Sequence, residues 1–242
     1  MIFNLFKSKP TLKEIIPNGF VDIHSHILPG IDDGPKKIKE SLSLISKIEN
    51  LGVTKIYATP HTYPGLYENT NNTIKESFNK VIDHIHNFNL NIKYSSEYMI
   101  DDSLIKKAEE KSILTLSENY ILVEMPLVGQ PKNLHEIIFE LNINGYRCIL
   151  AHPERYAYYK DDLKSFEKLK KIGCQFQLNL LSTIGRYGKS SLYLTKQLLK
   201  RDMIDFIGSD FHSQMDVNLC DNEMKGLNFN EIEKLCKICE NN

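Results

Sequence analysis

The chain has 242 residues, a formal net charge of -1, and 41% hydrophobic and 25% charged residues. These are ordinary values for a soluble globular protein. The near-neutral charge argues against nucleic-acid binding, which usually requires a strong basic excess. Because the sequence contains no run of about 18 apolar residues, we expect no transmembrane span.

The N-terminal residues and the cysteines suggest where the protein works. The first nine residues, Met-Ile-Phe-Asn-Leu-Phe-Lys-Ser-Lys, place apolar residues ahead of the lysines. A secretory signal has the opposite order and a longer apolar stretch, so we interpret residues 1 to about 18 as a short tail, amphipathic at its start. Cys236 and Cys239 have C-x-x-C spacing but lie in a charged, helix-like segment, which speaks against a redox or metal role. Together these features predict a cytoplasmic protein.

Short apolar runs alternate with amphipathic helical patterns along nearly the whole chain. The predicted strands are rich in Val, Ile, Leu, Phe and Tyr and span residues 20–24, 55–59, 92–97, 120–124, 148–152, 175–179 and 205–209. Between them, residues 37–50 and 134–144 carry apolar side chains at helical spacing. Gly52 and Gly173 stand where a helix ends and the next strand begins.

Seven strand–helix units predict a parallel sheet, because each crossover helix returns the chain to the same end of the sheet. A closed or nearly closed α/β barrel is the simplest architecture, and a doubly wound open sheet is the alternative. No Gly-, Pro- or Ser-rich linker interrupts the pattern. We therefore predict a single domain over residues 1–242, a length that barrels of this type commonly reach.

Every predicted strand ends in a polar or potential metal-binding side chain. These residues, with one aspartate of the first loop, are His24, His26, Asp33, His61, Glu97, Glu124, His152, Asn179, Asp210 and His212. In α/β barrels the active site lies at the carboxyl ends of the strands. Imidazole and carboxylate ligands without thiolates suit Mn, Fe, Zn or Mg. Backbone hydrogen bonds could explain two strand-end histidines, but so many clustered charges indicate compensating metal ions.

Five segments resemble the polymerase-and-histidinol-phosphatase (PHP) superfamily, and more narrowly its branch of bacterial protein-tyrosine phosphatases found with capsule and exopolysaccharide genes. They are Asp-Ile-His-Ser-His-Ile-Leu-Pro-Gly-Ile-Asp-Asp-Gly (22–34), Ala-Thr-Pro-His (58–61), Leu-Val-Glu-Met-Pro (122–126), Leu-Ala-His-Pro-Glu-Arg-Tyr (150–156) and Gly-Ser-Asp-Phe-His (208–212). The similarity spans roughly residues 20 to 215. It implies a distorted (β/α)7 TIM-like barrel, the PHP fold.

The resemblance also implies the site residues and the cofactor. Three divalent metal ions are expected, with Mn as the first choice and Fe, Zn or Mg as alternatives. The implied ligands are His24, His26, Asp33, His61, Glu97, Glu124, His152, Asp210 and His212. Arg155 would grip the phosphate, and its alternative role is an ion pair with a ligand carboxylate.

The implied activity is hydrolysis of phosphotyrosine on a protein partner, a bacterial tyrosine kinase that controls capsule or exopolysaccharide synthesis. A metal-bound hydroxide would attack phosphorus, with Asp33 or His212 as the proton donor. Arg186, which follows the sixth predicted strand, is either a second phosphate contact or a solvated loop residue. A cysteine phosphatase is not indicated, because six residues rather than the required five separate Cys148 from Arg155.

Two other functions fit the same residues. The first is a small-molecule phosphatase, such as one acting on histidinol phosphate. The second is a non-catalytic regulator that binds a phosphoprotein through its metals. Several tyrosines follow the predicted strands and could either line a phosphotyrosine pocket or pack as ordinary rim residues; they are Tyr63, Tyr67, Tyr156, Tyr158 and Tyr159. The sequence leaves the oligomeric state open.

Overall fold

The computed structural model describes residues 8–242. The amphipathic start predicted for the tail, residues 1–7, lies outside them. The part of the predicted tail that is described packs onto the protein, since Leu12 is fully buried in helix α1 (Leu12–Ile15). The backbone amide of Leu12 donates to Asn222, and that of Met224 donates to Pro10, so this segment is held against the chain near its C-terminal helix.

The strands form two parallel sheets. Their bounds are β1 (Phe20–Ser25), β2 (Val53–Ala58), β3 (His61–Thr62), β4 (Asn91–Tyr94), β5 (Glu97–Met99), β6 (Tyr120–Glu124), β7 (Arg147–Ala151), β8 (Gln175–Asn179) and β9 (Phe206–Gly208). One sheet has the order β1-β2-β4 and the other the order β3-β5-β6-β7-β8-β9. Every strand pair is parallel, as seven strand–helix units predict.

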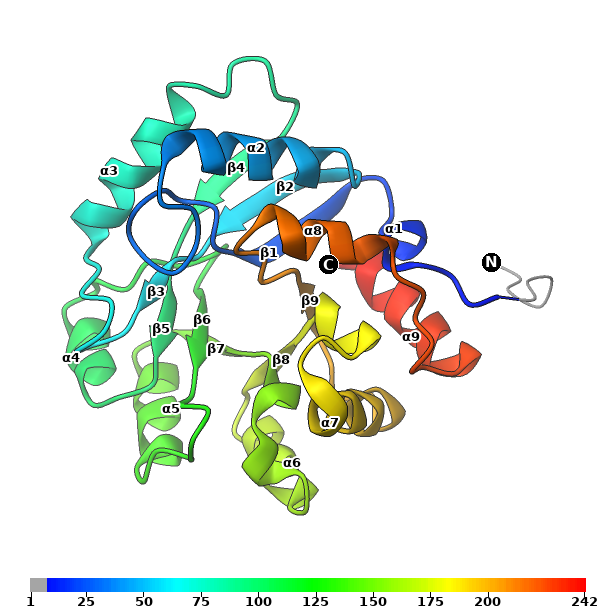
Figure 1. Cartoon of the computed structure of the whole chain (residues 1–242). Coiled ribbons are helices and arrows are strands. Elements are labelled where there is room, and N and C mark those ends of the chain that lie inside the picture. Colours follow the sequence, from blue (N-terminus) through cyan, green and yellow to red (C-terminus); the bar gives the residue numbers. More distant parts are fainter. Residues whose placement is uncertain (1–7) are drawn as a thin grey trace.

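The helices lie around the strands (Figure 1). After α1 come α2 (Ile38–Glu49), α3 (Asn71–Ile82), α4 (Ser103–Glu109), α5 (Leu134–Ile143), α6 (Leu163–Lys171), α7 (Gly188–Lys200), α8 (Gln214–Asn218) and α9 (Phe229–Glu240). Short 3-10 helices η2 (Pro153–Arg155), η3 (Ala157–Tyr159), η4 (Leu180–Ile184) and η5 (Leu219–Asp221) occupy loops between them. None of the helices within residues 8–242 combines the length and apolar character needed to cross a lipid bilayer.

The two sheets meet at both of their edges, which gives the strands a barrel-like arrangement. At one edge the amide of Asp210 donates to His24 and that of His26 donates to Phe211, joining β1 to the residues after β9. On the other side the chain itself joins the sheets, because it passes directly from β2 into β3 and from β4 into β5. This α/β arrangement of parallel strands agrees with the predicted distorted TIM-like barrel rather than with an open sheet.

The second and third predicted strands are each broken in two, and these breaks separate the sheets. Residues 59–60 divide β2 from β3, and Ser95 and Ser96 divide β4 from β5. Pro60 has no backbone N–H to continue the ladder. Its carbonyl instead accepts hydrogen bonds from the Glu97 amide, at 3.1 Å, and from the Ser96 hydroxyl, at 2.8 Å. The breaks therefore redirect the chain just before His61 and Glu97.

A small apolar cluster lies beneath the polar strand ends. It contains Ile23, Tyr57, Leu122, Ile149 and Ala151, one residue or more from each of four strands, and all are buried. The larger core, rich in Leu and Ile, packs the helices against the sheets. With the barrel filled below by apolar side chains, a ligand can reach the polar groups only from the carboxyl ends of the strands.

Candidate metal centre

Strand β1 brings two histidines together. His24 and His26 lie two residues apart, so strand alternation places both side chains on one face, and the register of β1 against β2 shifts between Asp22 and Ser25. Both histidines are fully buried, and their Nε2 atoms lie 3.2 Å apart. The neighbouring position must stay small, because a Cβ on Gly208 would lie 2.7 Å from the Cβ of His24.

The protonation of His24 follows from its contact with Gln177. The Gln177 Nε2 atom donates to the carbonyls of Leu178, at 2.8 Å, and Gly208, at 3.4 Å. This fixes the amide orientation, so Gln177 Oε1 accepts from His24 Nδ1 at 2.8 Å. With its proton on Nδ1, His24 directs the lone pair of Nε2 into the cluster, as a metal-ligating histidine does.

His26 is oriented in the same way, by a carboxylate. Its Nδ1 lies 2.8 Å from Asp32 Oδ2, while Asp32 Oδ1 accepts from the Gly34 amide. In the neutral form of His26, the Nε2 atom therefore also presents a lone pair. Burial opposes protonation of His26, but Asp32, Asp210 and Glu97 outweigh it and raise its pKa well above the usual value. The cluster thus favours additional positive charge between these groups.

Glu97 lies at the centre of the cluster and is fully buried. Its Oε2 atom lies 3.3 Å from His24 Nε2, 3.4 Å from His26 Nε2 and 3.0 Å from His61 Nδ1, and Oε1 lies 3.0 Å from His152 Nε2. Oε2 nevertheless has no hydrogen-bond partner within residues 8–242. Burial would raise the pKa of Glu97, but His24 and His61 hold it well below its usual value.

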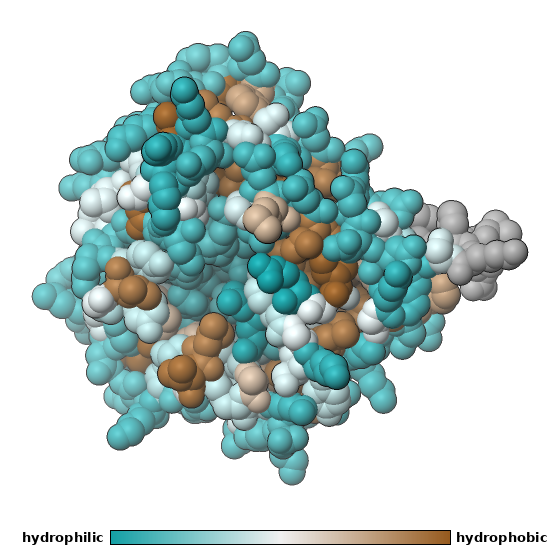
Figure 2. All heavy atoms as spheres, viewed as in Figure 1, coloured by the Kyte–Doolittle hydropathy of each residue, from teal (hydrophilic) through white to brown (hydrophobic). Residues whose placement is uncertain are grey.

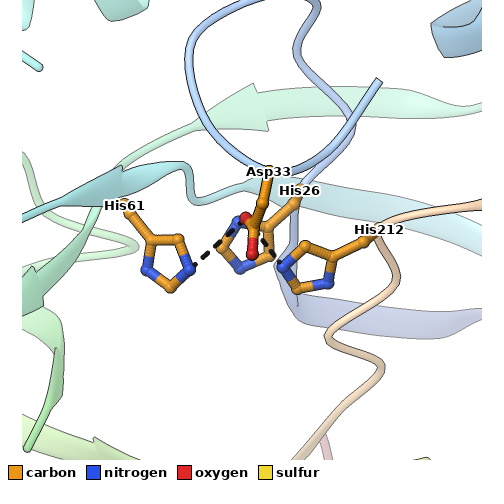
Figure 3. A group of neighbouring side chains, drawn as sticks. All are labelled: His26, Asp33, His61 and His212. Atoms are coloured by element: carbon orange, nitrogen blue, oxygen red, sulfur yellow. Dashed lines mark ion pairs between the residues drawn. The ribbon is translucent and has the colours of Figure 1, made fainter. Parts of the chain in front are cut away.

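A second face of the site contains Asp33, His26, His61 and His212, which point toward one another (Figure 3). Asp33 Oδ1 lies 3.2 Å from His212 Nε2 and 3.5 Å from His61 Nε2. The Nδ1 of His212 donates to the Asp210 carbonyl, so its Nε2 also faces the cluster. Asp33 is about half exposed, unlike the buried residues below it.

Arg155 and Asp210 form an ion pair at the wall of the site. Nη1 of Arg155 lies 2.9 Å from Oδ2 of Asp210, which also accepts from Asn179 Nδ2 at 2.7 Å. The guanidinium lies over the ring of Tyr187, 4.5 Å from its centroid, in a cation–π contact. The ion pair weighed as an alternative for Arg155 is therefore present, although the arginine still borders the cavity.

Two of the clustered residues have a left-handed backbone, which is uncommon for residues other than glycine. The φ angles are +36° for His152 and +54° for Asp210. Both residues come directly after a strand or within two residues of its end. Such conformations cost free energy and concentrate at functional sites. Here they turn the side chain of His152 toward Glu97 and the side chain of Asp210 toward His24.

The fold brings all nine predicted ligands into one cluster. Their donor atoms form four overlapping groups, and within each group the donor atoms all lie within 4.8 Å of one another. The groups are His26–Asp33–His61–His212, His24–His26–Glu97, His24–His152–Asp210 and His61–Glu97–Glu124. The predicted strand-end polar residue Asn179 contacts Asp210 rather than joining these groups. A donor set of imidazoles and carboxylates fits divalent Mn, Fe, Zn or Mg.

A cavity of about 670 Å³ opens above the cluster. Its lining includes Asp33, His61, Glu124, Arg155, Asp210 and His212, together with the predicted phosphate contact Arg186. Tyr63 and Tyr67 also line it, and the Tyr67 ring stacks on His61 with an interplanar angle of 10°. Figure 2 shows a mainly hydrophilic face with apolar groups around a central hollow.

The other three tyrosines do not line this cavity. Tyr156 is fully buried, because the chain turns into η2 and η3 after His152 and directs the ring beneath the loop that follows β6. Tyr158 and Tyr159 donate hydrogen bonds to that loop. Tyr187, which sequence reasoning missed, lines the cavity instead.

Residues 20–218 match the family described as capsular polysaccharide synthesis, CpsB/CapC. The protein belongs to this family. CapC from Staphylococcus aureus is 33% identical over 196 residues, covering 80% of this chain and 77% of CapC. The tyrosine-protein phosphatase CpsB from Streptococcus pneumoniae is 30% identical over 201 residues, covering 80% and 83%.

The solved structures lead to the same CpsB/CapC family. One match comes from work described as crystal structures of YwqE from Bacillus subtilis and CpsB from Streptococcus pneumoniae, unique metal-dependent tyrosine phosphatases. It has a TM-score of 0.77 at 26% identity and covers 83% of each chain. A lactonase from Listeria monocytogenes, with a TM-score of 0.51 at 11% identity, shares the fold alone.

Proposed function

We propose that this CpsB/CapC family member is a metal-dependent protein-tyrosine phosphatase. Its substrate would be phosphotyrosine on a protein partner, a bacterial tyrosine kinase that controls capsule or exopolysaccharide synthesis, and it would act in the cytoplasm. The relatives CpsB and YwqE carry the name tyrosine-protein phosphatase, which supports this assignment. The relation to CpsB extends over 80% of the chain, and the residues matched by the family, 20–218, span the positions of the whole cluster.

One observation carries the metal assignment. The Nε2 atoms of His24 and His26 face each other at 3.2 Å while their Nδ1 atoms are engaged elsewhere, and Glu97 Oε2 beside them lacks a hydrogen-bond partner. Two lone pairs and a carboxylate oxygen at such distances repel unless a proton or a metal cation lies between them, and a set of imidazoles and carboxylates is suited to a divalent metal. The proposed ligands, for three ions with Mn as the first choice, are His24, His26, Asp33, His61, Glu97, Glu124, His152, Asp210 and His212.

Bound divalent cations would neutralise phosphate charge and lower the pKa of a water toward the neutral range. Arg155 would bind the phosphoryl oxygens. Asp210 and Tyr187 hold its guanidinium at the cavity wall, and the planar group has further N–H donors for a bidentate contact. Arg186 lines the same cavity and is proposed as a second contact.

Asp33 and His212 are the proposed proton donors, because they are the more exposed members of the cluster and lie 3.2 Å apart. Either group would need to supply only partial protonation of the leaving oxygen. A phenol leaves with a pKa near 10, so a tyrosine oxygen requires less protonation than an alkoxide. This difference favours aryl phosphates over the alkyl phosphates of small metabolites.

Phosphate release by chelator-stripped protein tests the proposal, before and after addition of Mn²⁺, with a phosphotyrosine peptide and histidinol phosphate as substrates. We expect Mn²⁺ to restore release from the peptide. Release from histidinol phosphate alone would replace the proposal with a small-molecule phosphatase. If metal binds but neither substrate is hydrolysed while the phosphopeptide is retained, the protein is a phosphoprotein-binding regulator.

A further inference from the structure

The mouth of the cavity carries exposed apolar side chains. Leu66 is 62% exposed, Leu127 49% and Val128 96%, and all three line the cavity that opens above the metal-ligand cluster. Single exposed apolar residues are normal on protein surfaces. Several exposed apolar residues at the entrance of one polar cavity mark a binding surface more often than single scattered residues do. We define these three residues as the apolar rim.

Three tyrosines hold one side of the rim in place. The hydroxyl of Tyr156 accepts from the amide of Met125 at 3.0 Å, and that of Tyr158 donates to the carbonyl of Pro126 at 3.2 Å. Tyr159 donates to the side chain of Gln130 at 2.6 Å. These contacts fix the loop before and after Leu127 and Val128 from below, so the two side chains project outward from a supported backbone.

Leu66 belongs to a tight turn on a second loop. The amides of Tyr63 and Tyr67 donate to each other's carbonyls at 2.9 and 2.8 Å, and Gly65 has a φ of +83°, a conformation suited to glycine. The Tyr67 ring stacks on His61, which ties this turn to the cluster. Both rim loops are therefore fixed relative to the reacting centre, so little conformational entropy would be lost when a substrate binds.

We infer that the apolar rim binds apolar side chains next to the phosphotyrosine of the substrate, and so selects phosphotyrosine sites with aliphatic neighbours. The inference rests on the proposed function. The rim, Arg155 and the exposed part of the metal-ligand cluster line the same cavity. A peptide whose phosphate reaches Arg155 therefore passes the rim, which identifies the substrate peptide as the ligand of the rim. Leu127 and Val128 offer apolar surface, which favours aliphatic over charged neighbours.

The test compares L127S/V128S with wild type, both loaded with Mn²⁺. Three substrates are used: p-nitrophenyl phosphate, which has no flanking residues, and two phosphotyrosine peptides of equal length with Leu or Ser on both sides of the phosphotyrosine. Wild type should favour the Leu peptide about tenfold in kcat/KM, which equals about 1.4 kcal/mol and fits partial burial of two aliphatic side chains. The double variant should lose this preference while its kcat/KM on p-nitrophenyl phosphate stays within twofold.

Ile143→Ser is the matched control, since Ile143 on α5 is 64% exposed but does not line the cavity. It should retain the preference for the Leu peptide. Equal losses on all three substrates in L127S/V128S would overturn the inference, because the loop would then shape the reacting centre.

An unchanged preference would also overturn it. Vesicle sedimentation with phosphatidylglycerol and analytical ultracentrifugation of the same variants would then assign the rim to a membrane or to a second copy. If wild type cleaves p-nitrophenyl phosphate and neither peptide, the inference fails while phosphatase activity remains. If wild type with Mn²⁺ cleaves none of the three, the proposed function itself fails.

Discussion

Replacing Gln177 with Met should weaken metal binding although Gln177 is not a predicted ligand. Gln177 Oε1 accepts the Nδ1 proton of His24 at 2.8 Å, inside a fully buried environment. Met has a similar length and shape but only a weak acceptor sulfur. Without the amide oxygen, the His24 proton is better placed on Nε2, the atom that must face the metal.

The magnitude follows from this single contact. A buried donor left unpaired costs about 1–3 kcal/mol. Loss of an outer partner of a ligating histidine typically lowers metal affinity by about 10–100-fold, which equals about 1.4–2.8 kcal/mol. The two ranges agree, so we expect Mn²⁺ affinity to fall by at least about tenfold in Gln177→Met.

Competition of Mn²⁺ between the protein and a fluorescent chelator measures this change directly. Gln175→Met is the matched control, because Gln175 lies on the same strand β8 and its Oε1 has no hydrogen-bond partner within the described residues. Circular dichroism of both variants checks that the fold is kept. Equal Mn²⁺ affinities for Gln177→Met, Gln175→Met and wild type would refute the assignment of the His24 tautomer.

Four further outcomes are expected. His152→Ala should lose bound metal, measured by elemental analysis, and activity together. Arg155→Ala should keep its metal and lose about 10²–10³-fold in kcat/KM, as for loss of a transition-state donor; wild-type kcat/KM would show that Arg155 does not bind phosphate. Chelation should lower the Tm by about 5–10 °C, since saturation at 100 times Kd contributes about 2.7 kcal/mol. Burial raises the pKa of Glu154 to about 7, so the folded state holds this proton more tightly than the unfolded state and stability should fall as pH rises from about 4.5 through 7. In urea titrations of chelated protein, Glu154→Gln should remove up to about 3 kcal/mol of this fall.

The sequence was sufficient to predict that the nine His, Asp and Glu side chains come together, because parallel strands place their carboxyl ends at one edge. It named Asp33 as a ligand but gave no role to Asp32, the adjacent and chemically identical residue. Asp32 is buried and fixes the ring of His26, whereas Asp33 is about half exposed and faces His212. Only the path of the first loop, which packs Gly34 against the His26 carbonyl, decides between them.

Two other features depended on packing that a linear pattern does not contain. Gln177 lies two residues before Asn179 on β8, so strand alternation already placed both on one face, but its contact with His24 required the neighbouring strand. The tyrosines after β7 were compatible with either a wall or packing. The 3-10 turns of η2 and η3 decided for packing by burying Tyr156 completely.

The ion pair of Arg155 is compatible with a role in binding phosphate. A guanidinium has five N–H donors, and only Nη1 is engaged by Asp210, at 2.9 Å. Asp210 also lies 3.3 Å from His24 Nε2 and from His26 Nε2, so its carboxylate links Arg155 to the metal-ligand cluster. A cation bound there would draw on the same carboxylate and weaken its attraction for Arg155. In the proposed phosphatase, metal loading and release of Arg155 toward the phosphate would therefore be coupled through Asp210, which an arginine far from the cluster would not allow.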